Sequence, residues 1–388
     1  MRASVGLTIV WAIAVNAVCI LPSFLVGVLQ QSIAADFALP PASVGAAVAG
    51  FWLVAAVGAV PCSRLVRRRG ALWALRVAGI AAAIMGFAIG FASQSTLTFV
   101  VLMSVAGVVP ALATPALNVI TMSAVSFGRQ AFALTAAGAS PVFSLTLAGL
   151  LGPALGSLVG WRGVFAAVAV SSVVLVLLSL WLPRAANDGP APVRTDGRAT
   201  NSLRPLVIMM VGVGAGNLAV GAATSFLVVA APHSGVSVID AAVAVAVASA
   251  VSVLFRLMLA ALADRRRADP ILWVGVLLAF GAAGFVVLSF GSPATFYVGL
   301  VLVLIPGWSW VSFLLYTVLA RYRRAVAAAS GIVQMVFFAG GVIGPLGIGL
   351  VVGASSFSVA WWLLAAADCV AAASVFFWRR RLPAFISL

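Results

Sequence analysis

The chain contains no lysine and no glutamate, and charged residues make up only 7% of its 388 positions. Soluble domains carry about a quarter of their residues as charges, because a folded surface has to be hydrated. Hydrophobic residues account for 64% of this sequence. So small a supply of charge excludes a soluble globule of this length, and it indicates that membrane lipid covers much of the folded surface.

Metal-ligating and nucleophilic residues are equally scarce. There is one histidine, His233, and the three cysteines, Cys19, Cys62 and Cys369, lie far apart within or beside apolar runs. The sequence shows no metal-ligand spacing, nucleophile–base pair or phosphate-binding loop. We therefore expect no enzymatic activity, metal or cofactor. The formal charge of +15 does not indicate nucleic-acid binding, since the arginines form short clusters rather than a basic face with interleaved aromatics.

Long apolar runs dominate the rest of the chain. A helix needs about 20 apolar residues to cross a bilayer, and long runs without alternation favour helices over strands. The sequence therefore predicts an all-α polytopic membrane protein with twelve transmembrane helices. The predicted spans cover 5–29, 42–63, 71–92, 97–121, 131–159, 163–182, 205–231, 239–262, 271–290, 295–319, 326–352 and 357–378.

The placement of arginine supports this count. Clusters such as 64–69, 265–267, 321–324 and 379–381 follow even-numbered spans. Cytoplasmic loops are enriched in arginine and lysine, so twelve spans place every cluster on the cytoplasmic side together with both chain ends. The first apolar run is too long for a signal-peptide core. We predict a multi-pass protein of a bacterial cytoplasmic (inner) membrane, and nothing in the sequence requires more than a monomer.

One hydrophilic stretch divides the chain near its middle. Residues 184–204 are rich in Pro, Gly, Asp and Arg. This predicts an N-terminal six-helix bundle over 1–183, a cytoplasmic central loop over 184–204 and a C-terminal six-helix bundle over 205–388.

The two halves also repeat short motifs. Gly149-x-x-Gly152-Pro153 recurs as Gly341-x-x-Gly344-Pro345, and a Ser-Phe-Leu-Val sequence occurs in both the first and the seventh span. Glycine and proline interruptions at matching places in paired halves are typical of the moving parts of carriers. The halves are therefore predicted to be pseudo-symmetric.

Three segments resemble the major facilitator superfamily, in register over essentially the whole chain. Arg256 to Arg267, which includes Asp264-Arg265, is similar to the family's loop signature Gly-x-Leu-Ala-Asp-Arg. The stretch from Gly149 through Trp161-Arg162-x-x-Phe165 is similar to its fifth-helix motif and the start of its sixth helix, and 330–345 is the second-half counterpart. The resemblance implies two six-helix bundles that transport a solute by alternating access.

The resemblance also implies roles in the conformational change. Asp264 is expected to act as a latch that pairs with arginine and with a neighbouring helix N-terminus in one state only; a solvated loop acid is the alternative. Plain helix packing is the alternative for the glycines. The residues assigned to the switch are Asp264, Arg265, Arg256, Gly152, Pro153, Gly344 and Pro345.

The sequence departs from the family pattern at two positions. Arg67 stands where the first-half loop of the family usually has Asp, which puts a first-half latch in doubt. Met103 stands where proton-coupled relatives often carry Arg, which weakens a transfer of their coupling mechanism.

In this family the substrate cavity is lined mainly by the first, fourth, seventh and tenth spans. Polar and aromatic residues there, and a few in neighbouring spans, are therefore the substrate candidates. Asn inside a membrane needs a hydrogen-bond partner, so bonding between helices without ligand contact is the alternative role. The candidates are Asn16, Ser23, Trp52, Thr114, Asn118, Ser140, Asn217, Thr224, Ser225, Trp308, Trp310, Tyr316 and Gln334.

Charges at depth are nearly absent. Asp368 lies midway along the last span, and ionisable groups inside a membrane are functional candidates. Asp368 and Asp36 are named as coupling candidates; the alternative for Asp368 is a packing residue that is protonated or hydrogen-bonded. Arg76 and Arg256 are expected to snorkel to the cytoplasmic face.

These features favour a secondary active transporter of a small molecule. Proton-coupled export of small apolar or amphipathic compounds fits the apolar, aromatic cavity. A carrier or importer of a small organic anion or nutrient fits the absence of an Asp from the first-half loop. The sequence offers no deep arginine to hold the anion, which weakens this alternative. A non-transporting membrane scaffold or sensor is the third alternative.

Overall fold

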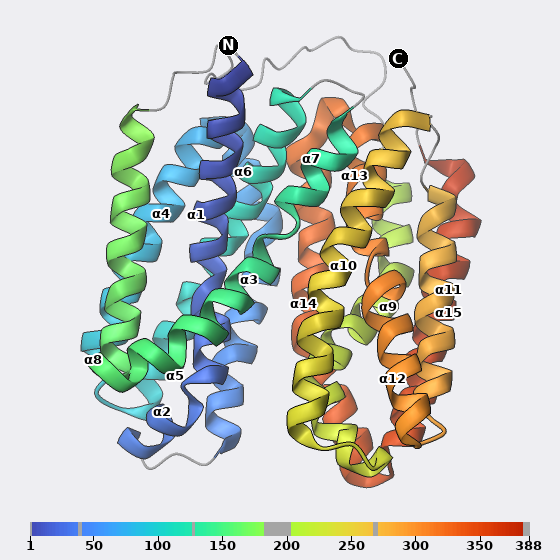
Figure 1. The fold of residues 1–388 in the computed structure, drawn as a ribbon. Coiled ribbons are helices and arrows are strands. Elements are labelled where there is room, and N and C mark those ends of the chain that lie inside the picture. The colour runs from blue at the N-terminus through green and yellow to red at the C-terminus, as the bar shows by residue number, and fades with distance from the viewer. Residues whose placement is uncertain (1, 38–40, 126–128, 182–202, 267–270, 383–388) are drawn as a thin grey trace. The chain divides into compact units, whose positions relative to one another are not determined.

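A computed structural model of the protein describes residues 2–37, 41–125, 129–181, 203–266 and 271–382 (Figure 1). Every regular element within these ranges is a helix. Twelve helical segments of the described chain are long and apolar enough to cross a membrane. The all-α, twelve-span fold is therefore confirmed, while the predicted central loop 184–204 lies largely outside the described residues.

The first six spans are built from the α-helices α1 to α8 and two shorter helical segments, η1 and η3. The two spans after the fourth share the long helix α8, and a short helix, α2, follows the first span. The bounds are α1 Arg2–Val28, α2 Gln30–Phe37, α3 Pro41–Arg69, α4 Ala71–Phe87 with the π-helical η1 Ala88–Ala92, α5 Thr96–Ala106, α6 Val108–Ala124, α7 Gln130–Ala137 and α8 Ser140–Leu178 with η3 Ser179–Trp181.

The second six spans are built from the seven α-helices α9 to α15. The tenth span is interrupted by a π-helical segment, η5. The bounds are α9 Arg204–Ala230 with η4 Ala231–Ser234, α10 Val238–Arg266, α11 Ile271–Leu288, α12 Pro293–Leu302, η5 Val303–Gly307, α13 Trp310–Arg321, η6 Arg323–Ala325, α14 Val326–Ala354 and α15 Phe357–Trp378 with η7 Arg379–Arg381.

A glycine makes the turn inside α8 that separates the fifth span from the sixth. Gly160 has φ of 68° and ψ of 169°, a backbone conformation that is essentially restricted to glycine. The two following residues, Trp161 and Arg162, therefore leave the turn in a direction that a residue with a Cβ atom would not permit at low energy.

The described residues form two compact units. Unit 1 comprises Met1–Ala124, Ala137–Asp196 and Val326–Met335, and unit 2 comprises Val125–Ala136, Gly197–Ala325 and Val336–Leu388. The units thus differ from a simple division at the central loop, because the segments 125–136 and 326–335 each cluster with the other half. The hydrogen bonds that hold these segments, described below, are the physical reason.

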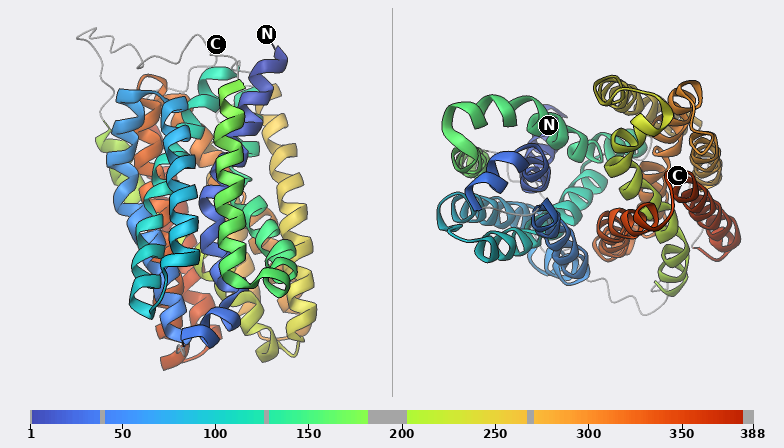
Figure 2. Two further views of the ribbon diagram at one scale, coloured as in Figure 1. Left: turned by 90° about the vertical axis from the view of Figure 1, so that its left-hand side faces the viewer. Right: turned by 90° about the horizontal axis from the view of Figure 1, so that it is seen from below.

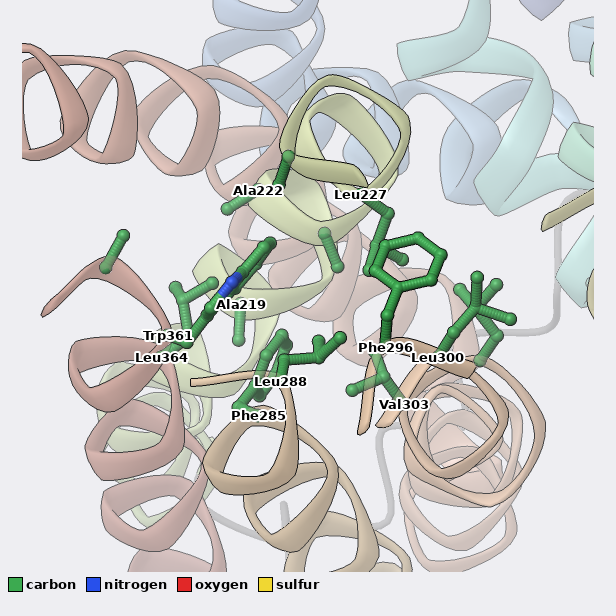
Figure 3. Packing of buried hydrophobic residues seen from close by; sticks show 14 of the residues in the cluster. Ala219, Ala222, Leu227, Phe285, Leu288, Phe296, Leu300, Val303, Trp361 and Leu364 are labelled. Atoms are coloured by element: carbon green, nitrogen blue, oxygen red, sulfur yellow. The ribbon is translucent and has the colours of Figure 1, made fainter. Parts of the chain in front are cut away.

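Each unit has its own apolar core between helices that run side by side, as the end-on view of Figure 2 shows. In unit 2 the core joins α9, α11, α12, η5 and α15 (Figure 3). Its largest members include Phe285 and Trp361, whose rings stack with centroids 6.0 Å apart. In unit 1, Phe51, Phe99 and Phe165 are fully buried in the corresponding place.

Small residues let the helix backbones approach closely. A Cβ atom at Gly107, between α5 and α6, would lie 2.0 Å from the carbonyl oxygen of Phe51 in α3. In unit 2, a Cβ atom at Gly344 would lie 2.4 Å from the carbonyl oxygen of Leu218 in α9. Association of helices in lipid depends on such packing, since the hydrophobic effect does not drive helices together there.

Replacement of Gly107 by Ala is expected to destabilise the protein by about 1–3 kcal/mol, because the added methyl group overpacks the contact with Phe51. Gly149→Ala is the matched control, since a Cβ atom added there would meet no atom of the described residues within 4 Å. There the gain in helix propensity, about 1 kcal/mol, should leave stability unchanged or raised. Thermal unfolding in detergent measures both, and equal shifts for the two variants would contradict the packing argument.

Candidate functional site

Three of the predicted polar residues meet in the interior of unit 1. The amide Nδ2 of Asn16 in α1 donates to Ser140 Oγ at 2.8 Å, and Thr114 Oγ1 in α6 donates to Asn16 Oδ1 at 2.9 Å. All three side chains are buried. Ser140 also donates to the carbonyl oxygen of Ala137. The network joins the first, fourth and fifth spans, so these groups satisfy one another.

Asn118 binds the start of the eleventh span within unit 1. Its Nδ2 donates to Ser330 Oγ at 2.8 Å, and both side chains are buried. A Cβ atom at Gly331 would lie 2.4 Å from Ser63 Oγ in α3. This hydrogen bond and this close approach explain why 326–335 clusters with unit 1 rather than with the rest of its own half.

Asn217 joins two helices of unit 2, α9 and α14. Its Nδ2 donates to the carbonyl oxygen of Phe337 at 2.7 Å and lies 3.3 Å from that of Val336. A Cβ atom at Gly340 would lie 2.0 Å from the same Nδ2 atom. The amide therefore fixes α9 against α14, and the small residue at position 340 makes room for it.

The remaining candidates have varied surroundings. Ser23 is buried and donates to a carbonyl oxygen of its own helix, whereas Ser225 is exposed and does likewise. Trp310, Tyr316 and Gln334 are buried, and Trp52 and Trp308 are partly buried. The side chain of Thr224 lies outside the described residues. Within the described chain the indole N–H of Trp310 is buried without a hydrogen-bond partner.

Asp264 lies at the end of the eighth span, and both of its carboxylate oxygens accept hydrogen bonds from the N-terminus of α7. Oδ1 accepts from the amide of Ala131 at 3.1 Å and Oδ2 from that of Phe132 at 2.9 Å. These amides belong to the first turn of α7, where no intrahelical acceptor exists. The side chain is 8% exposed, so the solvated-acid interpretation is wrong. The contact, together with the hydrogen bond from Arg323 to Gln130, holds 125–136 in unit 2.

Arg256 does not snorkel, contrary to the sequence-based expectation. The side chain is 6% exposed, and its Nε and Nη2 atoms donate to Ser252 Oγ at 3.1 and 2.9 Å. Its guanidinium carbon lies 5.0 Å from the ring centroid of Trp308. The serine one turn earlier and the indole face compensate the buried cation. Arg76 donates to the side chain and the carbonyl oxygen of Ser179, and Arg265 is exposed.

Asp368 is the acid buried inside the last span. It is 2% exposed, and its Oδ1 has no hydrogen-bond partner among the described residues. A small cavity beside it is lined by residues of α9, α11, the tenth span and α15.

Asp36 lies in α2, outside the spans, and binds the turn of α8. Trp161 Nε1 donates to Asp36 Oδ2 at 2.7 Å, and Arg162 forms an ion pair with the same oxygen. The Arg162 guanidinium also lies 4.3 Å from the Trp161 ring centroid. The Trp161 hydrogen bond, with that of Arg162, holds the pKa of the Asp36 carboxyl below its ordinary value.

The paired glycines of the Gly-Pro motifs occupy equivalent contacts. A Cβ atom at Gly152 of α8 would lie 3.0 Å from Val28 Cγ1 in α1, and Gly344 of α14 packs on α9 as described. Pro345 lies inside α14, and the side chain of Pro153 lies outside the described residues. Among the described residues, no group of three or more His, Cys, Asp or Glu side chains is placed to hold a metal ion.

Sequence reasoning did not find several partners. Ser330 and Phe337 contribute acceptors to candidates from distant segments, Ser252 accepts from Arg256 within the same helix, and Gly281 contacts Asp368 from another span. The only local signal is the spacing of Ser252 and Arg256, four residues apart on one helix face.

Replacing Asp264 by Ala should speed hydrogen exchange at the Ala131 and Phe132 amides by about tenfold or more. A hydrogen bond to a charged group contributes about 1.5–3 kcal/mol, and 1.4 kcal/mol corresponds to a factor of ten. Hydrogen-exchange mass spectrometry on the α7 peptide measures the effect. Asp240→Ala, which removes an exposed acid of the same unit, is the control, and unchanged exchange in Asp264→Ala would contradict the assignment.

The Asp36 cluster should stabilise the protein only while its carboxyl is ionised. Because the folded-state pKa is lowered, this stability is present above the ordinary value of about 3.9 and is lost as the pH falls through the lowered pKa. The pair is exposed (39% for Arg162 and 42% for Asp36), so the effect should be less than about 1 kcal/mol. Thermal unfolding should show Asp36→Asn below wild type at neutral pH and level with it in acid; a constant gap would contradict the prediction.

Comparison with known proteins agrees with this architecture. Residues 11–345 match the family described as Major Facilitator Superfamily. The structure is similar to that of the E. coli fucose:proton symporter, with a TM-score of 0.75, 14% identity, and coverage of 97% of this chain and 99% of that one. A proton:xylose symporter bound to 6-bromo-6-deoxy-D-glucose gives a TM-score of 0.72 at 14% identity, with 97% of this chain and 95% of that chain covered.

A human organic anion transporter gives a TM-score of 0.74 at 13% identity, with 96% of this chain and 99% of that chain covered. At such identities the likeness shows the fold alone. No curated protein sequence matches the chain. The family match, which covers most of the chain, and the twelve-span fold together show that the chain belongs to the major facilitator superfamily of membrane transporters.

Proposed function

We propose that this transporter exports small apolar or amphipathic compounds in exchange for protons, by alternating access across a bacterial cytoplasmic membrane. Both chain ends lie in the cytoplasm in this proposal, since the arginine clusters then all face inward. It works as a monomer surrounded by membrane lipid. The bundles over 1–183 and 205–388, joined by the loop 184–204, are the two bodies that move.

The observation that carries the substrate class is the pairing of the polar candidates. Asn16, Thr114 and Ser140 bind one another, Asn118 binds Ser330, and Asn217 binds backbone carbonyl groups of α14. A polar solute such as a sugar is held by many hydrogen bonds, and a site rejects ligands that leave its buried polar groups unpaired. Amides already satisfied within the protein therefore favour an apolar or amphipathic ligand that contacts aromatic side chains.

The Asp264 contact supports alternating access. The first turn of α7 is bound in unit 2, while the chain from Ala137 onward belongs to unit 1. A segment held by one unit and continued in the other changes its hydrogen bonds when the arrangement of the units changes. A carboxylate on two backbone amides suits such a switch, because the interaction is strong but depends on one geometry.

Proton coupling is supported by the buried acid of the last span. An ionisable group at membrane depth is costly and is therefore a functional candidate, and Asp368 has an unpartnered oxygen beside a cavity. Two of the structures that this chain resembles are named as proton symporters, which agrees with proton coupling on this fold.

A second candidate function, transport of a small organic anion, is favoured by one observation. Arg256 is buried beside Trp308, which supplies the deep cation that the sequence did not predict. Arginine binds carboxylates in a bidentate manner. A human organic anion transporter also has a similar structure.

Transport into liposomes distinguishes these functions. Purified protein is reconstituted with a trapped pH-sensitive dye, and ethidium, succinate or fucose is added under an imposed proton gradient. Ethidium, a flat amphipathic cation, is expected to move with a matching change in luminal pH, whereas succinate and fucose should give the signal of protein-free liposomes.

The outcomes separate the alternatives. Movement of succinate alone, lost in Arg256→Gln, would establish the anion carrier and overturn the exporter. Ethidium movement without any change in luminal pH would keep the substrate class and overturn the proton coupling.

A further inference from the structure

The carboxyl group of Asp368 is enclosed by the backbones of two other helices. A Cβ atom at Gly216 of α9 would lie 3.2 Å from Oδ1, and one at Gly281 of α11 would lie 2.4 Å from Oδ2. Only glycine at these positions leaves room for an acid so deep in the unit. The two glycines therefore leave a space in which this carboxyl group is buried between helices.

A cavity of about 10 Å³ lies beside the carboxyl group, a volume that holds about one water molecule. Its lining includes Val220 of α9, Phe285 of α11 and Trp308 of the tenth span. Apart from Asp368, no residue of the lining carries a side-chain oxygen or a titratable group. A metal cation such as Mg²⁺ or Ca²⁺ requires about six or more oxygen ligands, and the side chains of this lining supply only those of one carboxyl group, so the site suits a proton.

The π-helical segment η5 also lines the cavity, through Val303, Leu304 and Gly307. A Cβ atom at Gly307 would lie 2.7 Å from the Cα atom of Gly281, so η5 and α11 touch backbone to backbone beside the acid. Single π-helical turns inside α-helices occur frequently at functional sites. Movement of η5 would therefore change the space available to the carboxyl group directly.

Arg256 is connected to this site through Trp308, which lines the cavity: its guanidinium carbon lies 5.0 Å from the Trp308 ring centroid. α9, α11 and η5 contribute apolar residues to the lining. An isolated carboxylate is expensive to bury, and the neutral acid avoids this cost. The environment thus favours the protonated form unless water or a moved cation reaches the cavity.

We infer that Asp368 is the proton-binding group of this transporter and that its proton passes through the water-sized cavity that η5 lines. Binding transfers a proton from a hydronium ion to one carboxylate oxygen, which forms an O–H bond and leaves one water; release is the reverse. The side chain alternates between charges of −1 and 0, and no other reactant is needed. The inference rests on the proposed proton coupling and names the site that performs it.

Infrared difference spectroscopy of the reconstituted protein tests proton binding without any substrate. A pH change between about 6 and 9, well above the ordinary aspartate pKa of about 3.9, should produce a protonated-carboxyl band that shifts in D₂O, is absent in Asp368→Asn and remains in the control Asp240→Asn. A band that persists in Asp368→Asn, or no band in wild type, would overturn the inference whatever the protein transports.

A second measurement separates the site from the transport function. With ethidium as the probe, Asp368→Asn should lose proton-driven movement to the level of protein-free liposomes but keep exchange of ethidium for ethidium, which requires no net proton transfer. Proton-driven movement that survives in Asp368→Asn would overturn the inference while leaving the proposed function intact. Absence of ethidium transport in wild type would contradict the proposed function, and the infrared result would still decide the site.

Glycine variants test the position of the carboxyl group. Gly281→Ala places a methyl group against Oδ2 and should shift the carboxyl band and impair proton-driven movement. Gly214→Ala, where the added Cβ atom would make an ordinary contact of 3.4 Å with Val336, should change neither. Equal spectra for Gly281→Ala and wild type would contradict the enclosure of the carboxyl group by α9 and α11.

Discussion

The hydrocarbon interior of the membrane offers no hydrogen bonds, and most of this structure follows from that constraint. Backbone groups must be satisfied within helices, so every regular element of the described chain is helical. Polar side chains must find partners in other helices, and Asn16, Asn118 and Asn217 each do so. The few groups that remain without a partner, such as Asp368 Oδ1, are therefore the places where function is to be sought.

Glycine has the complementary role. At some places where a polar side chain approaches another helix, a glycine lies opposite it, as Gly340 does for Asn217 and Gly281 for Asp368. Close approach replaces the hydrophobic driving force that soluble proteins use. The same contacts leave little freedom for intermediate positions, which suits a protein that changes between discrete states.

The repeated halves use this arrangement twice, with differences. Gly152 and Gly344 pack the fifth and eleventh spans on the first and seventh, yet the deep charges Arg256 and Asp368 occur in unit 2 among the described residues. Asp264 binds the start of α7, whereas Arg67 occupies the matching place in the first-half loop and is exposed. The two units thus share a scaffold and differ in charge.

Sequence alone determined the twelve spans and the all-α class, because length and hydropathy of a run are local properties that the bilayer thickness selects. It also pointed to Asp264, since the motif at the end of the eighth span is contiguous. Tertiary structure decided which amides bind one another, why Arg256 stays buried and which glycines surround Asp368. Those contacts join residues far apart in the chain, and no local pattern records which helix face meets which partner.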